Sequence, residues 1–300
     1  MRTQVSILST LLLIFLSNDL VAGQPAKSAN ATYTNDIVLS NLLKRINTDA
    51  GESWISIHPN GHVALFGRHN NGFSEHRIFI TFRSDNDWTT PEPVPFVTDE
   101  GSRAARFSPD GGFVVFSSDR AVPGEQKGES DWNLWQVIYK GDNNWGEPEP
   151  LLGVFKSVKN DFHASVASNT NIYFGSRRDG GKGNSDMYVA EKSGFDWSVS
   201  SLNLLNTTHS EPDPFIDPAG RYIIFARTDA EDGFGGDDLY ISYRDGVHWS
   251  VPRNLGAQVN SAEYEYGAFV SHDEKILFYT TYRDGHADIT YVLMDKILAE

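Results

Sequence analysis

The sequence predicts an all-β fold, a five-bladed β-propeller of four-stranded antiparallel blades, and two observations carry the prediction. Tryptophans recur at intervals of 57, 52 and 52 residues, at Trp88, Trp145, Trp197 and Trp249. Short apolar runs separated by turn residues such as Pro-Asp-Gly accompany these tryptophans along the chain. A repeat of this length with about four strands per unit is typical of propeller blades.

One complete repeating unit spans residues 211–255. An apolar run from Pro214 to Ile216 meets a Pro-Ala-Gly turn, a second run follows from Tyr222 to Phe225, and a glycine-rich hairpin leads to a third run at 239–241. Short apolar runs bounded by glycine, proline and aspartate read as antiparallel hairpins. With Trp249 in a fourth strand, the unit predicts one blade.

Five candidate first strands set the predicted number of blades, and six blades stay open as an alternative that needs one more unit. These strands are Ile55 to Ile57, Ala104 to Phe107, Ala164 to Val166, Pro214 to Ile216 and Ala268 to Val270. The second strands agree with this count, and they are centred on Phe66, Phe116, Phe174, Phe225 and Tyr279.

The two ends of the chain predict how the ring closes. The last unit stops without a Trp-x-x-Pro strand, whereas the segment from Asp36 to Leu42 resembles that strand and ends in the same Asn-Leu pair. We therefore expect an N-terminal strand over 36–42 to complete the last blade, because an open seam would leave unpaired strand edges. Helical turns are expected only at 40–46 and 295–299.

The N-terminus and the composition indicate an exported protein. Residues 1–23 combine a basic start, a short apolar centre and small residues before Gln24, which predicts a signal peptide. Residues 24–34 read as a disordered linker and 35–300 as a single propeller domain, which we expect in the periplasm or the medium as a monomer. No later apolar run is long enough to span a membrane.

Charge and cysteine content exclude several classes of function. The chain has 25 basic and 40 acidic residues, a formal charge of −15, and no basic run, which argues against nucleic acid and anionic membranes as partners. Cysteine is absent, which excludes disulfides, thiolate metal sites and a cysteine nucleophile. No G-x-S-x-G motif is present, which argues against a serine hydrolase.

Several motifs resemble a known family. They are Ser108-Pro109-Asp110-Gly111, Phe116-Ser117-Ser118-Asp119-Arg120, Gly235-Gly236-Asp237-Asp238-Leu239-Tyr240, and Trp249 with Pro252 and Leu255. Together they resemble the WD-forty-like repeats, with their SPDG turn, of the Tol-system propeller protein and of other exported bacterial β-propellers, over residues 36–294. The resemblance implies the fold and export but little chemistry, because such propellers serve as binding platforms, as peptidase lids and at times as lyases or glycosidases. No N-terminal α/β domain is seen, so a Tol-like partner is not carried over.

Two aligned columns at the start of the first strands contain the candidate site residues. The first column reads Glu52, Ser102, Asp161, Glu211 and Glu265, and the second reads Trp54, Ala104, His163, Asp213 and Gly267. If each first strand is innermost, both columns approach one mouth of the central channel. As ligand-binding residues we predict Trp54, His163, Asp213 and Glu265.

A structural role competes with a functional one for the acidic column. An arginine follows every second strand, at Arg68, Arg120, Arg178, Arg227 and Arg283, which favours salt bridges between blades. We expect such pairing for Glu265, and a functional role for Glu211 together with Asp213. The three repeated tryptophans, Trp145, Trp197 and Trp249, are expected to be structural.

The function predicted from these patterns is binding of a ligand or a protein partner on one face of the ring. The alternative is a glycosidase-like carbohydrate-active enzyme that uses Glu52, Asp161 and Glu211 as catalytic carboxylates. The glycine-rich loops 180–186 and 232–238 leave calcium open as a cofactor, although hairpin turns explain them better. The nine histidines show no metal-ligand spacing, so no metal site is predicted.

Overall fold

The computed structural model describes residues 36–70, 75–97, 101–125, 132–168, 170–283 and 285–298. The predicted signal peptide (1–23) and linker (24–34) lie outside the described residues. The regular secondary structure of the described chain is mostly β-strand, in antiparallel meanders in which a first strand pairs with a second and the second with a third.

Three of the sheets are single meanders that follow one another along the chain. The first contains β1 (Gly51–Ile57), β2 (Val63–His69), β3 (His76–Ser84), β4 (Asp87–Trp88) and β5 (Glu92–Pro93). The second contains β6 (Ser102–Phe107), β7 (Phe113–Ser118), β8 (Asn133–Ile138) and β9 (Glu149–Pro150). After the short 3-10 helix η1 (Gly153–Phe155), the third contains β10 (Asp161–Val166), β11 (Ile172–Ser176), β12 (Asp186–Ser193) and β13 (Asp196–Ser201).

The remaining strands form one eight-stranded sheet that contains two meanders. They are β14 (Phe215–Ile216), β15 (Tyr222–Thr228), β16 (Asp237–Asp245), β17 (His248–Trp249), β18 (Arg253–Asn254), β19 (Tyr264–Val270), β20 (Ile276–Arg283) and β21 (His286–Leu293). A single parallel pair, Asp237 with Tyr264, joins β16 to β19, whereas the other strand pairs in this sheet are antiparallel.

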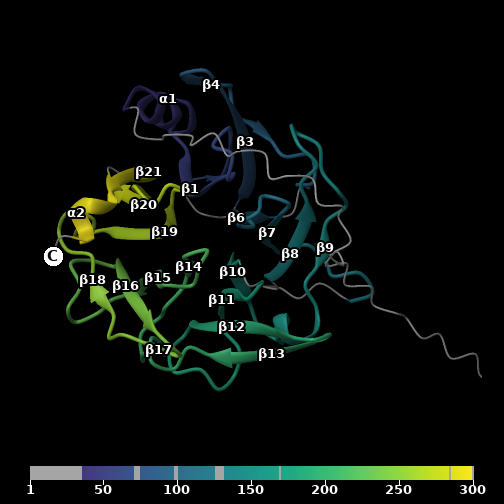
Figure 1. Ribbon diagram of the computed structural model, residues 1–300, viewed down its shortest axis with the longest axis vertical. Coiled ribbons are helices and arrows are strands. Elements are labelled where there is room, and N and C mark those ends of the chain that lie inside the picture. Colours follow the sequence, from purple (N-terminus) through teal and green to yellow (C-terminus); the bar gives the residue numbers. More distant parts are fainter. Residues whose placement is uncertain are drawn as a thin grey trace, which may run out of the picture.

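The sheets are arranged as a ring around a central axis (Figure 1). The first strands β1, β6, β10, β14 and β19 lie around the middle of the ring, and β4, β9, β13 and β17 lie toward its outside. In four meanders the second strand places a phenylalanine in the core at the same position of the register, and each is 0% exposed: Phe66, Phe116, Phe174 and Phe225. In the last meander the equivalent residue is Tyr279, as the sequence pattern indicated, because Glu265 pairs with Thr281 two residues after Tyr279, just as Glu52 pairs with Arg68 two residues after Phe66.

The predicted N-terminal strand is wrong, because residues Asp36–Ile46 form the helix α1. Its buried residues Val38, Leu39, Leu42 and Ile46 recur with the spacing of one helix face rather than with the alternation of a strand. The helix lies beside β21 and β4 (Figure 1). A second helix, α2 (Met294–Leu298), follows β21, so both predicted helical turns coincide with helices. No helix in the described ranges is both long and apolar enough to cross a membrane.

A side chain, rather than a strand, satisfies the outer edge of β21 next to α1. The Asn47 amide donates to the Ile289 carbonyl at 2.8 Å and accepts from the Ile289 N–H at 3.1 Å. Asn206 makes the same two bonds to Met187, and Asn260 makes them to Leu239. The segments that lead into β1, β14 and β19 therefore each bond an asparagine to a third strand, and α1 packs beside β21, which has no fourth strand among the described residues.

The three repeated tryptophans pack against aromatic rings. The Trp145 ring lies 4.9 Å from that of Phe96, and Trp197 lies 4.9 Å from Phe155. Trp249, on β17, meets Tyr173 of the neighbouring sheet edge-on at 6.5 Å. These contacts fit the structural role predicted for the three tryptophans.

Candidate functional site: a pocket at the ring centre

Five equivalent residues near the starts of the first strands share a left-handed backbone. They are Trp54 (φ 56°), Ala104 (φ 53°), His163 (φ 53°), Asp213 (φ 59°) and Gly267 (φ 66°). In four of the five meanders the pairing register shifts at this position, as in a β-bulge. Left-handed backbone at non-glycine residues is costly and concentrates at functional sites. Here it falls on the second column identified in the sequence.

A pocket of about 500 Å³ lies at this level of the ring. Its aromatic walls come from four residues, Trp54, Tyr264, Tyr266 and Tyr282. Besides these aromatic residues, it contains an arginine, a histidine and two aspartates: Arg103, His163, Asp213 and Asp237. Apolar walls with a few convergent polar groups are typical of small-molecule sites. Three of the four predicted ligand-binding residues, Trp54, His163 and Asp213, therefore lie together.

Asp213 is the most constrained carboxylate of the pocket. It is 3% exposed, its Oδ2 accepts a hydrogen bond from Trp54 Nε1 at 3.0 Å, and its Oδ1 is in direct contact with His163 Nδ1. The ring of His163 also lies 5.0 Å from that of Trp54. The three side chains come from three different meanders, so they form one polar cluster across the axis of the ring.

His163 is a neutral imidazole in this setting. Burial lowers its pKa well below that of free histidine, and the positive charges of Arg103 and Arg106 act in the same direction. A neutral imidazole facing the Asp213 carboxylate carries its proton on Nδ1. Its Nε2 is then an acceptor, and in the described part of the chain no group donates to it.

A second polar chain supports the opposite wall. The Ser53 hydroxyl lies 2.9 Å from the Tyr266 hydroxyl and 3.1 Å from His69 Nε2. The other ring nitrogen of His69 lies 3.0 Å from the Asn70 carbonyl. Burial raises the pKa of Tyr266, so this phenol stays protonated at physiological pH. The chain holds the Tyr266 ring in the pocket.

Asp237 differs from Asp213 in its surroundings. Burial raises its pKa, and the nearby charge of Asp229 acts in the same direction, whereas a hydrogen bond from Thr228 at 2.6 Å opposes the shift. Two carboxyl groups with different environments can take the roles of acid and base in one site.

The acidic column itself is taken up by structural hydrogen bonds. Arg68 holds Glu52 at 2.7 Å, Arg178 holds Asp161 at 2.9 Å, and Arg227 holds Glu211 at 3.0 Å, with each acid 0% exposed. The same acids accept from hydroxyls or amides four residues earlier, at Thr48, Ser157 and Thr207. None of these three carboxylates lines the pocket.

These three arginines do not form the salt bridges between sheets that the sequence predicted. Each arginine instead connects its sheet to the chain segment that leads into that sheet. Arg68 also donates to the Ile46 carbonyl, Arg178 to that of Val154 and Arg227 to that of Leu205. Each of these carbonyls lies in the chain segment just before the sheet. The reason is register, because Glu52 and Arg68 lie opposite each other on β1 and β2.

The structure reverses the prediction of which acid, Glu265 or Glu211, forms a salt bridge with an arginine. Glu211 has the arginine, whereas Glu265 accepts from the hydroxyls of Ser261 and Thr281 at 2.7 Å each. Arg283 donates to Thr281 at 3.1 Å and so reaches the acid only indirectly. Glu265 lies outside the pocket, and its role in ligand binding stays a prediction.

The two glycine-rich loops fold around a carboxylate. In the first, the amides of Lys182 and Gly183 donate to Asp186. In the second, the amides of Phe234 and Gly235 donate to Asp238. Among the described residues, no group of three or more His, Cys, Asp or Glu side chains is placed to hold a metal ion.

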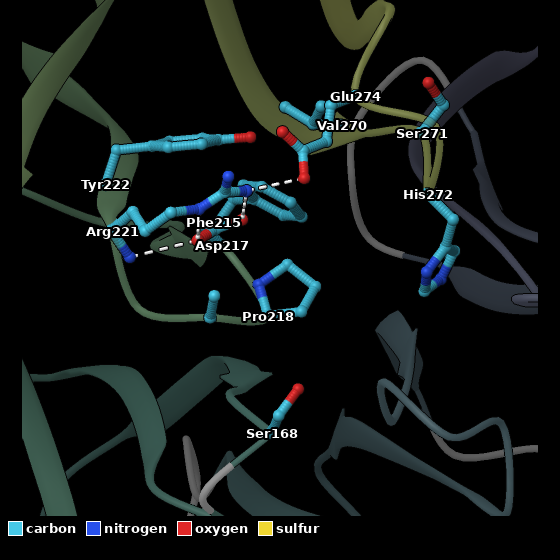
Figure 2. Close-up of a pocket in the computed structure, with 11 residues that line it drawn as sticks. Ser168, Phe215, Asp217, Pro218, Arg221, Tyr222, Val270, Ser271, His272 and Glu274 are labelled. Atoms are coloured by element: carbon cyan, nitrogen blue, oxygen red, sulfur yellow. Dashed lines mark hydrogen bonds and ion pairs between the residues drawn. The ribbon is translucent and has the colours of Figure 1, made fainter.

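A second pocket, of about 310 Å³, lies at the other end of the first strands (Figure 2). Tyr264 and Tyr266, near the start of β19, line the first pocket, whereas Val270 at its end lines the second. Figure 2 shows the Arg221 side chain between Asp217 and Glu274, and it bonds them at 2.7 and 2.6 Å. The arginine of this second pocket is therefore fully engaged by two carboxylates.

Sequence reasoning missed Arg103, Asp237 and the three tyrosines of the first pocket. Arg103 and Tyr266 directly precede the left-handed residues of their strands, in a column that reads Ser53, Arg103, Phe162, Pro212 and Tyr266. Strict strand alternation would point this column away from the channel. Its lack of a repeated residue type is the signal that could have identified it.

Comparisons with known proteins identify the fold. No family model matches the chain, and no curated protein matches it. TolB from Acinetobacter baumannii is a similar solved structure, with 12% identity, a TM-score of 0.52, and coverage of 83% of this chain and 53% of that one. This chain thus spans about half the length of TolB.

Two glycoside hydrolases are similar over most of their length. One, described only as a glycoside hydrolase, has 12% identity and a TM-score of 0.56 and covers 83% of this chain and 88% of its own. An α-L-arabinofuranosidase from Lactobacillus brevis has 11% identity and a TM-score of 0.51, with coverage of 81% and 90%. The chain therefore has the fold of a β-propeller, with a ligand-sized pocket at the centre of its ring.

Proposed function

We propose that this protein is an exported propeller that binds a small polar ligand in the pocket formed by Trp54, Asp213 and their neighbours, on one face of the ring. The observation that carries the proposal is that three of the left-handed residues, Trp54, His163 and Asp213, come from three meanders and line one pocket of about 500 Å³. Strained backbone is retained where a site demands it. Aromatic walls with few polar groups favour a compact ligand over a flat protein surface.

Replacing Tyr264 by alanine tests this proposal. Tyr264 is 46% exposed at the pocket wall and meets Tyr282 edge-on at 6.2 Å, so its loss should remove ligand contact without disturbing the core. We expect the Tyr264→Ala variant to bind its ligands from a panel of small polar molecules about tenfold more weakly than the wild-type protein does. Ligand-observed NMR measures the difference.

The matched control is Phe195→Ala, which removes an aromatic ring that is 100% exposed in the turn between β12 and β13. It should leave both binding and thermal stability unchanged. If every ligand of the wild-type protein bound Tyr264→Ala with unaltered affinity, the binding site would lie elsewhere, and the proposal would be wrong.

A glycosidase-like enzyme is the second candidate, and the pair of pocket carboxyl groups favours it. The raised pKa of Asp237 suits a general acid, and Asp213 is held by Trp54 and His163 as an anion would be. If the protein is such an enzyme, we propose Asp237 and Asp213 as its catalytic residues. A catalytic role of Glu52, Asp161 and Glu211 remains the alternative assignment.

Hydrolysis of aryl glycosides separates the two assignments. Asp237→Asn should abolish turnover if the pocket acids are catalytic, whereas Glu211→Gln should reduce it only in proportion to the folded fraction. No turnover by the wild-type protein on a broad set of aryl glycosides and polysaccharides would leave ligand binding as the function.

We also propose that the ring has five blades. The support is that the two meanders of the eight-stranded sheet share only the single pair Asp237 and Tyr264, as neighbouring blades do at their inner ends. Calcium at the glycine-rich loops remains a proposal, which thermal melts with and without calcium would test. The carboxylates of Asp186 and Asp238 already accept loop amides, so we expect a small effect.

A further inference from the structure

The guanidinium of Arg103, in the central pocket, forms no ion pair within the described part of the chain. It lies over the ring of Trp132 at 4.0 Å and that of Trp54 at 5.7 Å. In the described ranges no acceptor is hydrogen-bonded to it, and its Nε is buried without a partner. The carboxylate of Asp119 acts on it only at a distance. Arg221, by contrast, holds two carboxylates in the second pocket (Figure 2).

Neither of the two carboxyl groups of the same pocket forms an ion pair with Arg103. Asp213 is already engaged by Trp54 and His163, and Asp237 is hydrogen-bonded to Thr228. Arg177, which lies over Phe162 at 5.9 Å, adds a second positive charge that acts on both Arg103 and His163. Within the described part of the chain, the pocket therefore combines two carboxyl groups that are held by other residues with an arginine that forms no ion pair, in a protein whose formal charge is −15.

Arg103 also remains charged in spite of its burial. Burial lowers its pKa to about 10, still well above physiological pH. A desolvated charge without a close partner is costly, and contact with indole rings offsets only part of that cost. The charge is thus kept in the pocket at the expense of stability, as expected where a ligand supplies the partner.

We propose that the ligand of the central pocket is a small carboxylate, anchored by Arg103 and with its carbon skeleton against the aromatic walls. The proposal rests on the proposed function of this pocket. A guanidinium binds a planar carboxylate through two parallel hydrogen bonds. The walls of Trp54, Tyr264 and Tyr266 suit a ring, and about 500 Å³ suits a molecule of one or two rings.

The experiment compares matched acids and neutral molecules: D-galacturonate with D-galactose, and benzoate with benzamide. Binding is followed by tryptophan fluorescence, since Trp54 and Trp132 flank Arg103, and by ligand-observed NMR. We expect at least one acid to bind about tenfold or more tightly than its neutral partner. Arg103→Gln should remove this difference, and Arg103→Lys should keep only part of it.

The control is Arg83→Gln, which makes the same change of charge at the far end of β3, where Arg83 donates to the Asp85 carbonyl. It should leave the preference for the acid intact. If the neutral molecules bind as tightly as the acids and Arg103→Gln changes nothing, the pocket is a binding site but not one for carboxylates. If neither member of any pair binds, the proposed function fails together with this inference.

Discussion

Replacing Glu211 by glutamine should lower the free energy of unfolding by about 3–5 kcal/mol. Glu211 is 0% exposed and accepts from Arg227, from the Thr207 hydroxyl and from the Thr207 amide. Glutamine removes the negative charge, leaves the Arg227 guanidinium nearly buried and unpaired, and turns an N–H₂ group toward groups that donate. Urea unfolding of the two proteins measures the difference.

Two further variants show which part of this loss comes from the charge. Glu265→Gln disturbs a carboxylate of equal burial whose partners are Ser261 and Thr281, so we expect a smaller loss of about 1–3 kcal/mol. The exposed Glu263→Gln should be neutral. Equal losses at Glu211 and Glu265 would mean that the arginine contributes nothing.

Deleting α1 should destabilise the fold more than either of these substitutions. Its four buried side chains, Val38, Leu39, Leu42 and Ile46, are each at most 1% exposed, and burial of one such side chain contributes about 1.5–3 kcal/mol. The deletion of 36–46 should therefore cost about 6 kcal/mol or more. It would also uncover β21 and the buried Trp88. Thermal melting and urea unfolding of the shortened protein provide the test.

Point variants within the helix serve as the matched comparison. Leu42→Ala should cost about 2–5 kcal/mol, whereas Ile37→Ala should cost less than about 0.5 kcal/mol, because Ile37 is 53% exposed on the opposite face. Wild-type stability after the deletion would contradict the conclusion that α1 covers the last sheet.

Much of the fold could be predicted from the sequence because its signals are local. The Pro-Asp-Gly turns, the apolar runs between them and the recurring tryptophans each act within a few residues, and together they predicted antiparallel meanders in a ring. The column of Trp54, His163 and Asp213 was found in the same way, since equivalent positions of a repeat occupy equivalent places around the axis. The blade count rests on the same reasoning and stays a prediction.

Only the tertiary structure decided which polar side chains are used in salt bridges and which line the pocket. Glu211 and Asp213 are two residues apart and look alike in sequence, but the register of β15 against the inner strand gives Arg227 to the first and leaves the second beside Trp54 and His163. Arg103 was missed because strand alternation points its column away from the channel, and the bulge at Ala104 departs from that alternation. The helix α1 was misread for a related reason. The predicted strand rested on the likeness of residues 36–42 to the segment around Trp249, whereas the buried face of the helix packs beside β21 and β4, which are distant in the sequence.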